Sequence, residues 1–412
     1  MSKQLQADAI VVGAGPAGIA AVARLLPAGR RVIWVDEQPR PGGQIWRGTA
    51  LPRVDALRQH PGLSYLPGHA VVAAESPQEL LLHAAAGQQT LHVRAPQLLL
   101  ALGARERMLP FPGWTLPGVH GAGGLQALVK GGWPIAGRRV LLAGSGPLLL
   151  ASAATLRAAG AKLLGIYEQA PRGALARFAV GLPPGKMAQA LGLGWRLRGL
   201  PYAAGCWPLR ALGEGKLEAV LLTDGRREWT QACDALGVGF GLLPNTELAE
   251  LLGCALQDGA IAVDAAMQTS LPGVFAAGEC TGFGGVDKAS LEGEMAAAAM
   301  LGQALRPYAR RHAGQLAFAR RLVRHFALRP ELLQLADAKT LICRCEDVTL
   351  GALKSWPQWR DAKLQTRCGM GACQGRICGP ITQTLLGWPE ASGGRGTRAP
   401  LQPVPLRCLM DD

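Results

Sequence analysis

Residues 8–36, DAIVVGAGPAGIAAVARLLPAGRRVIWVD, decide the fold of this chain of 412 residues. A β-branched apolar run at residues 8–12 predicts a strand that leads into a glycine-rich turn. A helical stretch follows at residues 19–26, and a second apolar run at residues 32–35 ends in Asp36. A strand, a glycine-rich turn, a helix and a second strand closed by an acid form the fingerprint of a dinucleotide-binding α/β unit.

The glycines of this turn have separate roles. Gly13 allows the tight turn, Gly15 lets the backbone approach a pyrophosphate, and Gly18 lets the helix and the strand pack closely. The N-terminus of the helix offers free N–H groups and a positive dipole end to phosphates, and Asp36 can accept hydrogen bonds from a ribose. The predicted nucleotide site is therefore Gly13, Gly15, Pro16, Ala17, Gly18, Asp36 and Glu37.

A second unit of the same kind begins at residues 138–150, RRVLLAGSGPLLL, and its next strand ends in Glu168. Leu149 or Leu150 takes the place of the third glycine, which should push the helix away from the strand or block the close approach of a ligand. Glu168 would repel a 2′-phosphate, which argues against NADP. Three interpretations stay open: a degenerate scaffold, an adenine nucleotide held without turnover, and a working NAD(H) site. The residues concerned are Gly144, Gly146 and Glu168.

Five of the ten cysteines lie within residues 341–380, together with several glycines that let the backbone wrap tightly round a compact object. No histidine follows residue 327, which excludes a mixed Cys/His zinc site in this region. The spacing, Cys-x-Cys followed by Cys-x4-Cys, also differs from the Cys-x2-Cys pairs that zinc favours. All-thiolate iron–sulfur ligation therefore fits best, with zinc and free or regulatory thiols as the alternatives.

Composition sets broad limits on the class of protein. Apolar residues make up 49% and charged residues 17% of the chain, which excludes a disordered protein and indicates two or three domains. The net charge of +14 comes from scattered arginines, so we expect no nucleic-acid partner, and a docking face for an acidic redox partner stays open. The start has no signal-peptide pattern, and the apolar stretch at residues 140–156 is broken by a glycine-rich turn. We expect a cytoplasmic protein, with a peripheral position on the inner face of the cell membrane as the alternative.

Three further stretches resemble two-dinucleotide flavoproteins of the thioredoxin reductase and glutathione reductase group. Residues 39–45, PRPGGQI, resemble the loop that covers the flavin, and residues 98–104, LLLALGA, resemble the exit from the first half of the FAD domain. Residues 273–279, GVFAAGE, resemble the late FAD motif, whose last residue is usually Asp and is Glu here. The resemblance implies that FAD is bound and that its site also includes Gly43, Gln44, Ala101, Gly103, Gly278 and Glu279.

The dithiol chemistry of the disulfide reductases is missing from this sequence. No Cys-x4-Cys follows Gly42 and Gly43, and no Cys-x2-Cys occurs in the second unit. Candidate substrate bases are few: His120 in a glycine-rich loop reads as structural more readily than catalytic. Glu292 and Glu294 are expected at a helix start, where they would complement the helix dipole. The catalytic residues are therefore left unassigned.

Residues 366–376, TRCGMGACQGR, resemble the [2Fe–2S] module named after bacterioferritin-associated ferredoxin, in the version fused to flavin-dependent amine dehydrogenases. We assign Cys343, Cys345, Cys373 and Cys378 as the four ligands on this resemblance, with Cys368 as the spare thiol. Nearly the whole chain is similar to the α (or A) subunit of the heteromeric dye-linked amine dehydrogenases, a group that includes opine oxidases, D-hydroxyproline dehydrogenase and hydrogen cyanide synthase.

The resemblance implies that this chain is an electron-relay subunit. A partner subunit related to D-amino-acid oxidase would oxidise an amine (a D-amino acid, imino acid or opine), and electrons would pass through FAD and the cluster to a quinone or dye acceptor. An FMN at the subunit interface and a small ferredoxin-like third subunit occur in some members and stay open. The alternatives are a self-contained NADH-dependent reductase that passes electrons through FAD to its cluster, and a non-enzymatic binding protein.

The expected fold is α/β, with a Rossmann-like FAD domain, an inserted second Rossmann-like domain and a small helical C-terminal [2Fe–2S] module. Residues 292–324 read as helical, and the Gly- and Pro-rich tail is either disordered or an extended arm. The expected parts are the FAD domain at 1–118 and 246–305, the second dinucleotide-type domain at 119–245, a helical linker at 306–330, the cluster module at 331–386 and the tail at 387–412.

Overall fold

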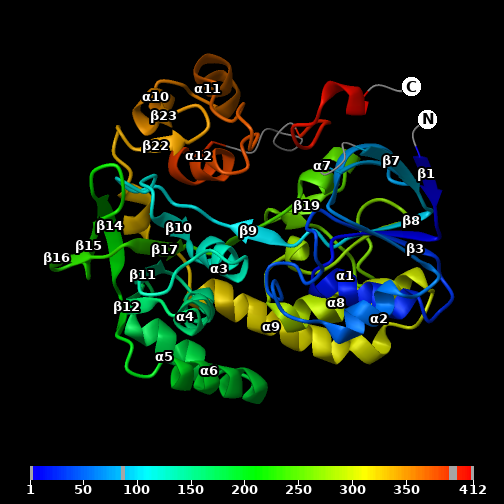
Figure 1. The fold of residues 1–412 in the computed structure, drawn as a ribbon, viewed down its shortest axis with the longest axis horizontal. Coiled ribbons are helices and arrows are strands. Elements are labelled where there is room, and N and C mark those ends of the chain that lie inside the picture. The colour runs from blue at the N-terminus through cyan, green and yellow to red at the C-terminus, as the bar shows by residue number, and fades with distance from the viewer. Residues whose placement is uncertain (1–2, 85–88, 389–396, 410–412) are drawn as a thin grey trace. The chain divides into compact units, whose positions relative to one another are not determined.

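The computed structural model describes residues 3–84, 89–388 and 397–409 (Figure 1). The chain forms two compact units, and each is described by itself. Unit 1 comprises residues 1–105, 242–319 and 396–412, and unit 2 comprises residues 106–241 and 320–395. This division differs in detail from the expected parts, whose boundaries stay a prediction.

Unit 1 is built round a five-stranded parallel sheet of order β21-β8-β2-β3-β4. Its strands are β2 (Ala9–Val12), β3 (Val32–Asp36), β4 (Leu63–Pro67), β8 (Gln97–Leu100) and β21 (Val274–Ala276). The apolar run of β2 is completely buried because it is the central strand, with helices on one face and a second sheet near the other. The order reverses between β2 and β8, and in open α/β sheets ligands bind outside the carboxyl ends of strands at such a point.

Helix α1 (Pro16–Leu25) connects β2 with β3 and packs against α8 (Val286–Met300). The approach is close because an ideal Cβ on Gly293 of α8 would overlap the carbonyl oxygen of Ala17. The other elements of unit 1 are β1 (Lys3–Gln6), β5 (His69–Ser76), β6 (Glu79–Ala84), β7 (Gln89–Arg94), α2 (Pro52–Arg58), β18 (Leu242–Pro244), α7 (Glu247–Leu252), β19 (Leu256–Gln257) and β20 (Ala260–Ile261), with short 3₁₀ turns at Glu279–Thr281, Arg306–Tyr308 and Leu406–Leu409.

Residues 292–324, expected to be helical, contribute to two helices, α8 and α9 (Ala309–His325). Gly302 adopts a left-handed φ of 68°, which ends the first helix, and Pro307 follows in a 3₁₀ turn. Helix α8 also begins earlier than expected, at Val286, so Glu292 lies in its interior and the expected helix start was wrong. Strand β9 (Ala104–Glu106) and α9 continue from one unit into the other.

Unit 2 repeats the same plan. Its five-stranded sheet has the order β10-β17-β11-β12-β13 and is parallel throughout. The strands are β10 (Val119–Gly121), β11 (Arg139–Gly144), β12 (Lys162–Glu168), β13 (Tyr202–Ala204) and β17 (Ala235–Gly239), and the helices that follow β10, β11 and β12 are α3 (Ala122–Lys130), α4 (Leu148–Ala158), α5 (Arg172–Val180) and α6 (Pro184–Arg196). An antiparallel sheet adds β14 (Trp207–Leu212), β15 (Ala219–Thr223) and β16 (Glu228–Ala232).

The thiol-rich segment belongs to unit 2 and shares one hydrophobic core with the antiparallel sheet. Trp114 packs in that core and donates a hydrogen bond of 2.7 Å from its Nε1 to the carbonyl oxygen of Leu341. The segment is therefore anchored on the second Rossmann-like fold. Its elements are β22 (Leu341–Cys343), β23 (Val348–Thr349), α10 (Leu350–Lys354), α11 (Trp359–Thr366) and α12 (Cys378–Leu386), preceded by a 3₁₀ turn at Pro330–Gln334.

The described part of the tail, residues 397–409, packs on unit 1; the expectation of a disordered segment or an extended arm at residues 389–396 and 410–412 lies outside the described residues. Leu401 is buried, and its N–H donates to the carbonyl oxygen of Val72 at 2.7 Å. The Cys408 Sγ lies 3.5 Å from Nδ1 of the buried His83. None of the helices in the described residues is both long and apolar enough to cross a membrane.

Candidate functional site

The first fingerprint holds two glycines at which any side chain would overlap backbone atoms. An ideal Cβ on Gly13, which has a left-handed φ of 109°, would overlap the carbonyl oxygen of Ala101. An ideal Cβ on Gly18 would overlap the carbonyl oxygen of Gly13. The turn, the exit of β8 and the first turn of α1 are therefore packed backbone against backbone, as the predicted fingerprint requires.

The remaining glycine of the turn faces open space. Gly15 is the N-cap of α1 and has an unstrained φ of −80°. An ideal Cβ on it would meet only the Cα of Gly43, at 3.9 Å. The loop that carries Gly43 is fixed by a hydrogen bond of 2.7 Å from the N–H of Gly42 to the carbonyl oxygen of Ala14. Because a helix N-terminus opens here between two glycines, an anionic group can approach the backbone closely.

Asp36 is buried at the end of β3 and is directed at the same turn. One carboxylate oxygen accepts a hydrogen bond from the N–H of Ala14, and the other accepts one from Gln38 at 2.6 Å. Burial raises its pKa, which these hydrogen bonds partly offset. Glu37 and Gln44, also predicted for this site, have exposed side chains.

The late motif, residues 273–279, also packs against the turn of the first fingerprint. An ideal Cβ on Gly278 would lie 3.0 Å from the Cβ of Ala17, so the motif packs on the first turn of α1. Ala101 and Gly103 lie at the exit of the neighbouring strand, where the N–H of Ala101 donates to Val12 at 2.8 Å. The structure therefore gathers the three predicted flavoprotein stretches round one turn.

Glu279 carries an unpartnered atom. Its Oε1 accepts hydrogen bonds from the N–H groups of Gly285 at 2.8 Å and Gly284 at 3.3 Å. Its Oε2 is buried and receives no hydrogen bond from any residue that the structure describes. Burial raises the pKa of this carboxyl group. A buried acceptor without a donor is costly, so Oε2 is suited to a hydroxyl group of a bound molecule.

Sequence reasoning missed a buried charged network beneath this motif. The Lys288 Nζ lies 2.8 Å from the Glu292 carboxylate and donates to the carbonyl oxygens of Gly278 at 3.1 Å and Gly282 at 2.9 Å. The second carboxylate oxygen of Glu292 lies 2.9 Å from Nε2 of His312. The only sequence signal was the i, i+4 spacing of Lys288 and Glu292.

The network holds the loop in place. Burial acts to raise the pKa of Glu292, but the hydrogen bond from His312 and the charge of Lys288 together hold that pKa below its ordinary value. Glu292 also accepts from the N–H of Gly278 at 2.9 Å. These contacts fix the conformation of the loop that presents Glu279, and they replace the helix-dipole role expected for Glu292.

The second fingerprint has the same turn, but the acid at the end of its second strand bonds to a different residue of that turn. Glu168 is buried at the end of β12 and accepts hydrogen bonds from the N–H groups of Gly146 at 2.7 Å and Ala170 at 2.9 Å. Burial raises the pKa of Glu168 to about 7. Gly146 matches Gly15 of the first turn, whereas the shorter Asp36 reaches only the residue before that position. The carboxylate thus accepts from the N–H of the residue that corresponds to Gly15.

Residues 326–329 of the chain cover this second turn. Ser145 Oγ donates to the carbonyl oxygen of Phe326 at 3.0 Å, and an ideal Cβ on Gly146 would lie 3.9 Å from the Phe326 ring. The buried Gln169 donates to the carbonyl oxygen of Ala327 at 3.0 Å and accepts from the N–H of Arg329 at 3.1 Å. The turn is therefore packed against the linker that leads to the thiol-rich segment.

Leu149 does not force the helix and strand of unit 2 apart, as the sequence suggested. It is buried, and its Cδ2 would lie 3.3 Å from an ideal Cβ on Gly239 of the neighbouring strand β17. An ideal Cβ on Gly144 would overlap the Gly239 carbonyl oxygen, so the turn and β17 are in close contact. The glycines of β17 provide the room that the third fingerprint glycine provides in unit 1.

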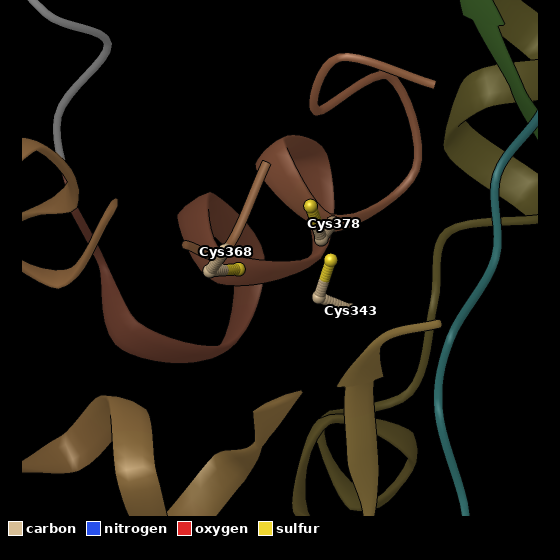
Figure 2. A group of neighbouring side chains, drawn as sticks. All are labelled: Cys343, Cys368 and Cys378. Carbon is tan, nitrogen blue, oxygen red and sulfur yellow. The ribbon is translucent and has the colours of Figure 1, made fainter. Parts of the chain in front are cut away.

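The thiol-rich segment brings Cys343, Cys368 and Cys378 together, as Figure 2 shows. All three are buried, and their sulfur atoms lie within 4.8 Å of one another. The hydrogen bond with Cys368, together with burial, raises the pKa of Cys378. Three soft ligands at this separation can hold a thiophilic metal centre.

The other two thiols form a pair beside this group. Cys345 is exposed and Cys373 is half-buried. A hydrogen bond from the backbone N–H of Cys373 acts to lower the pKa of Cys345, but burial and the neighbouring Cys373 thiol outweigh it, and the pKa is raised. Each member of the Cys-x-Cys pair thus lies next to one member of the Cys-x4-Cys pair. The structure also places Cys368, the predicted spare thiol, beside Cys343 and Cys378.

His120 lies in unit 2, on β10, with its ring 5.6 Å from that of Trp133. Burial lowers its pKa, and the nearby Arg344 and Arg138 lower it further. A half-buried histidine with a lowered pKa, packed on an aromatic ring, fits a structural role better than a catalytic one.

Comparisons with known proteins identify the family of this chain. Residues 7–302 match the family described as pyridine nucleotide-disulphide oxidoreductase. The chain is 35% identical to the A subunit of opine oxidase from Rhizobium meliloti (strain 1021) and 34% identical to the HcnB subunit of hydrogen cyanide synthase from Pseudomonas aeruginosa, and each alignment covers 98% of both chains.

Solved structures are similar in fold. L-proline dehydrogenase from P. horikoshii superposes with a TM-score of 0.70 at 19% identity, covering 100% of this chain and 81% of that chain. Thioredoxin reductase from T. acidophilum gives a TM-score of 0.57 at 21% identity over 72% of this chain and 98% of that chain. The mixed α/β architecture with two Rossmann-type folds is confirmed, and the chain is an oxidoreductase that belongs to the pyridine nucleotide-disulphide oxidoreductase family.

Proposed function

We propose that this chain is the electron-relay subunit of a heteromeric amine dehydrogenase. In this proposal a partner flavoprotein, related to D-amino-acid oxidase, oxidises a D-amino acid, imino acid or opine. This chain then passes the electrons towards a quinone or dye acceptor. Bound FAD would supply two-electron chemistry and a [2Fe–2S] cluster would supply one-electron transfer.

The observation that carries the proposal is the filled second fingerprint. An enzyme that draws electrons from NADH needs a free turn at its second Rossmann-like fold. Here Glu168 accepts the N–H of Gly146, and Phe326 lies over the same turn. Electrons would therefore reach this chain from another source, which argues against the self-contained NADH-dependent reductase.

The residues of unit 1 fit FAD. The open face of Gly15 and the N-terminus of α1 would receive the pyrophosphate, and Asp36 would accept from the adenosine ribose. The unpartnered Oε2 of Glu279 would accept from a hydroxyl of the ribityl chain. The longer side chain at this position is compatible with the fold because its first oxygen is held by two backbone N–H groups.

The five thiols fit an iron–sulfur cluster. We assign Cys343, Cys345, Cys373 and Cys378 as its ligands, because Cys343 neighbours Cys378 and Cys345 neighbours Cys373. Two adjacent pairs suit a cluster in which each of two irons takes two thiolates. Cys368 would then be a fifth thiol packed against the first pair.

The names of the relatives support the presence of a partner subunit. The opine oxidase and hydrogen cyanide synthase relatives are both named as subunits of larger enzymes, and both align over nearly their full length. The alpha subunit of a sarcosine oxidase from Rhizobium meliloti (strain 1021) is 30% identical over 40% of this chain and 19% of its own length. An interface FMN and a small ferredoxin-like third subunit belong to the same hypothesis, and we propose neither.

The test is to tag the chain in its native host and purify it gently. The preparation is assayed for dye reduction with NADH and with D- and L-amino acids, imino acids and opines. The proposal expects a stoichiometric flavoprotein partner, substrate-dependent dye reduction and no response to NADH. A chain that purifies alone and reduces the dye rapidly from NADH would overturn it.

The ligand assignment has a separate test that needs no activity. Serine is introduced singly at each of the five cysteines, and iron content and the visible spectrum are measured. Changes at Cys343, Cys345, Cys373 and Cys378 should each abolish the cluster, whereas Cys368→Ser should retain it. Loss of the cluster in Cys368→Ser, with an intact cluster in one of the other four variants, would refute the assignment.

A further inference from the structure

Helix α6 of unit 2 exposes an apolar stripe to solvent. Pro184, Ala188, Leu191 and Trp195 follow one another at helical spacing and are all exposed, and 71% of Trp195 is accessible to solvent. Leu197 follows the last residue of the helix and is buried in a core that includes residues of α4. It shows which side of the helix faces the protein. In an ordinary surface helix the apolar stripe faces the core and the polar side faces water.

The helix has little to hold it in place within the chain. It contains no buried residue, and among the described helices it packs chiefly on α4, through a small contact. Gly185, Gly192 and Gly194 lie inside it and face open space, which lowers its intrinsic helical stability. Its last turn is fastened by Arg157 of α4, which donates to the carbonyl oxygens of Arg196 at 3.1 Å and Arg198 at 3.0 Å.

The stretch of sequence that contains this helix carries charge of one sign. Residues 169–213, which include α5 and α6, contain six basic residues and no acidic residue. Arg198 lies over the ring of Trp195, with 4.6 Å between the guanidinium carbon and the ring centroid. A second exposed apolar side chain, Val180, ends α5 just before this helix and is 89% accessible. Apolar and basic groups are thus interleaved on one segment.

We propose that α6 is a docking surface for an anionic membrane. A helix with Trp and Leu on one face, basic flanks and no acids lies in the plane of a bilayer, with its apolar face among the acyl chains and its cations at the headgroups. A second copy of the chain fits this surface poorly, because two wholly basic segments would repel each other. The inference stands apart from the relay role, since vesicle binding requires neither cofactor nor substrate.

The test uses the purified full chain, with any subunits that accompany it, and co-sedimentation with lipid vesicles. Phosphatidylcholine vesicles containing phosphatidylglycerol should bind the protein at least about ten-fold more tightly than phosphatidylcholine alone, and salt should weaken the binding. The double variant Leu191→Gln, Trp195→Gln should lose about ten-fold or more in affinity. Leu406→Gln, which changes an equally exposed leucine of unit 1, is the matched control and should bind as the unmodified chain does.

Two further measurements locate the contact. Brominated lipids should quench part of the tryptophan fluorescence in the unmodified protein, and Trp195→Phe should remove that part while keeping the affinity. Lys186→Glu with Arg196→Glu should abolish the preference for anionic vesicles. The proposal is overturned if the protein binds no vesicles, or if the Leu191, Trp195 double variant binds as well as the unmodified chain. It is also overturned if that variant instead dissociates a protein complex in gel filtration.

Discussion

Gly18 and Leu149 occupy the same position in two turns that otherwise share the pattern Gly-x-Gly-Pro. In unit 1 the glycine lets α1 pack directly on the turn, and the face of Gly15 stays open. In unit 2 the glycines of β17 accommodate the leucine, and the turn is closed by Glu168 and Phe326. Two turns of the same Rossmann-like pattern can therefore differ in how the rest of the chain packs against them.

The turn of unit 1 packs against a late motif that is held by the buried Lys288, Glu292 and His312 network. The largest loss of stability that we expect comes from breaking this network. Lys288→Met would remove the ammonium group that pairs with the buried Glu292 carboxylate, which should destabilise unit 1 by about 3–5 kcal/mol. Thermal unfolding of the variant measures this loss. The double variant Lys288→Met, Glu292→Leu should recover part of the stability. An unchanged melting temperature in the single variant would show that the network does not hold the late motif.

Gly18→Ala tests the close packing of the first turn. Its methyl group would overlap the backbone oxygen of Gly13, so we expect a loss of about 3 kcal/mol together with the loss of bound flavin. Leu149→Met, a nearly volume-conserving change at the matching position, should cost less than about 1.5 kcal/mol. Chemical denaturation followed by circular dichroism compares the two. Equal stability of both variants would contradict the difference drawn between the turns.

The carboxyl group that closes the second turn should make stability depend on pH. The pKa of Glu168 in the folded chain is about 7, above its ordinary value of 4.5, so the folded state binds the proton more tightly than the unfolded state. Its contribution is fully present below about pH 4.5 and is lost as the pH rises through about 7, a change of up to about 3 kcal/mol. Glu168→Gln should flatten the melting temperature between pH 5 and 8. A profile that keeps the same slope in this variant would exclude Glu168 as the cause.

The smallest expected effect on stability comes from alanine at Gly15. This variant tests flavin binding separately from folding. Gly15→Ala has an unstrained backbone and open space, so the chain should fold normally but retain about ten-fold less flavin. Gly146→Ala, at the matching position with a left-handed φ of 94°, should lose about 1–2 kcal/mol of stability and keep its flavin. Flavin absorbance per chain and thermal unfolding are measured for both. Full flavin content in Gly15→Ala would remove the first turn from the site.

Much of the nucleotide site could be predicted because its signals are local. The positions of Gly13, Gly18 and Asp36 follow from a strand, a turn and a helix that adjoin one another in sequence. The late motif, more than two hundred residues away, was found only through resemblance. The network of Lys288, Glu292 and His312 was missed because burial, and not spacing, gives those residues their role.

The sequence by itself determined the two Rossmann-like folds and the concentration of thiols near the C-terminus, because glycine turns, apolar runs and cysteine spacing are local properties. Only the tertiary structure decided that the second turn is closed, since Phe326 reaches Gly146 from a linker 180 residues further along the chain. It also decided that Cys368 lies beside Cys343 and Cys378. These pairings depend on how distant segments pack, which no pattern within one segment can specify.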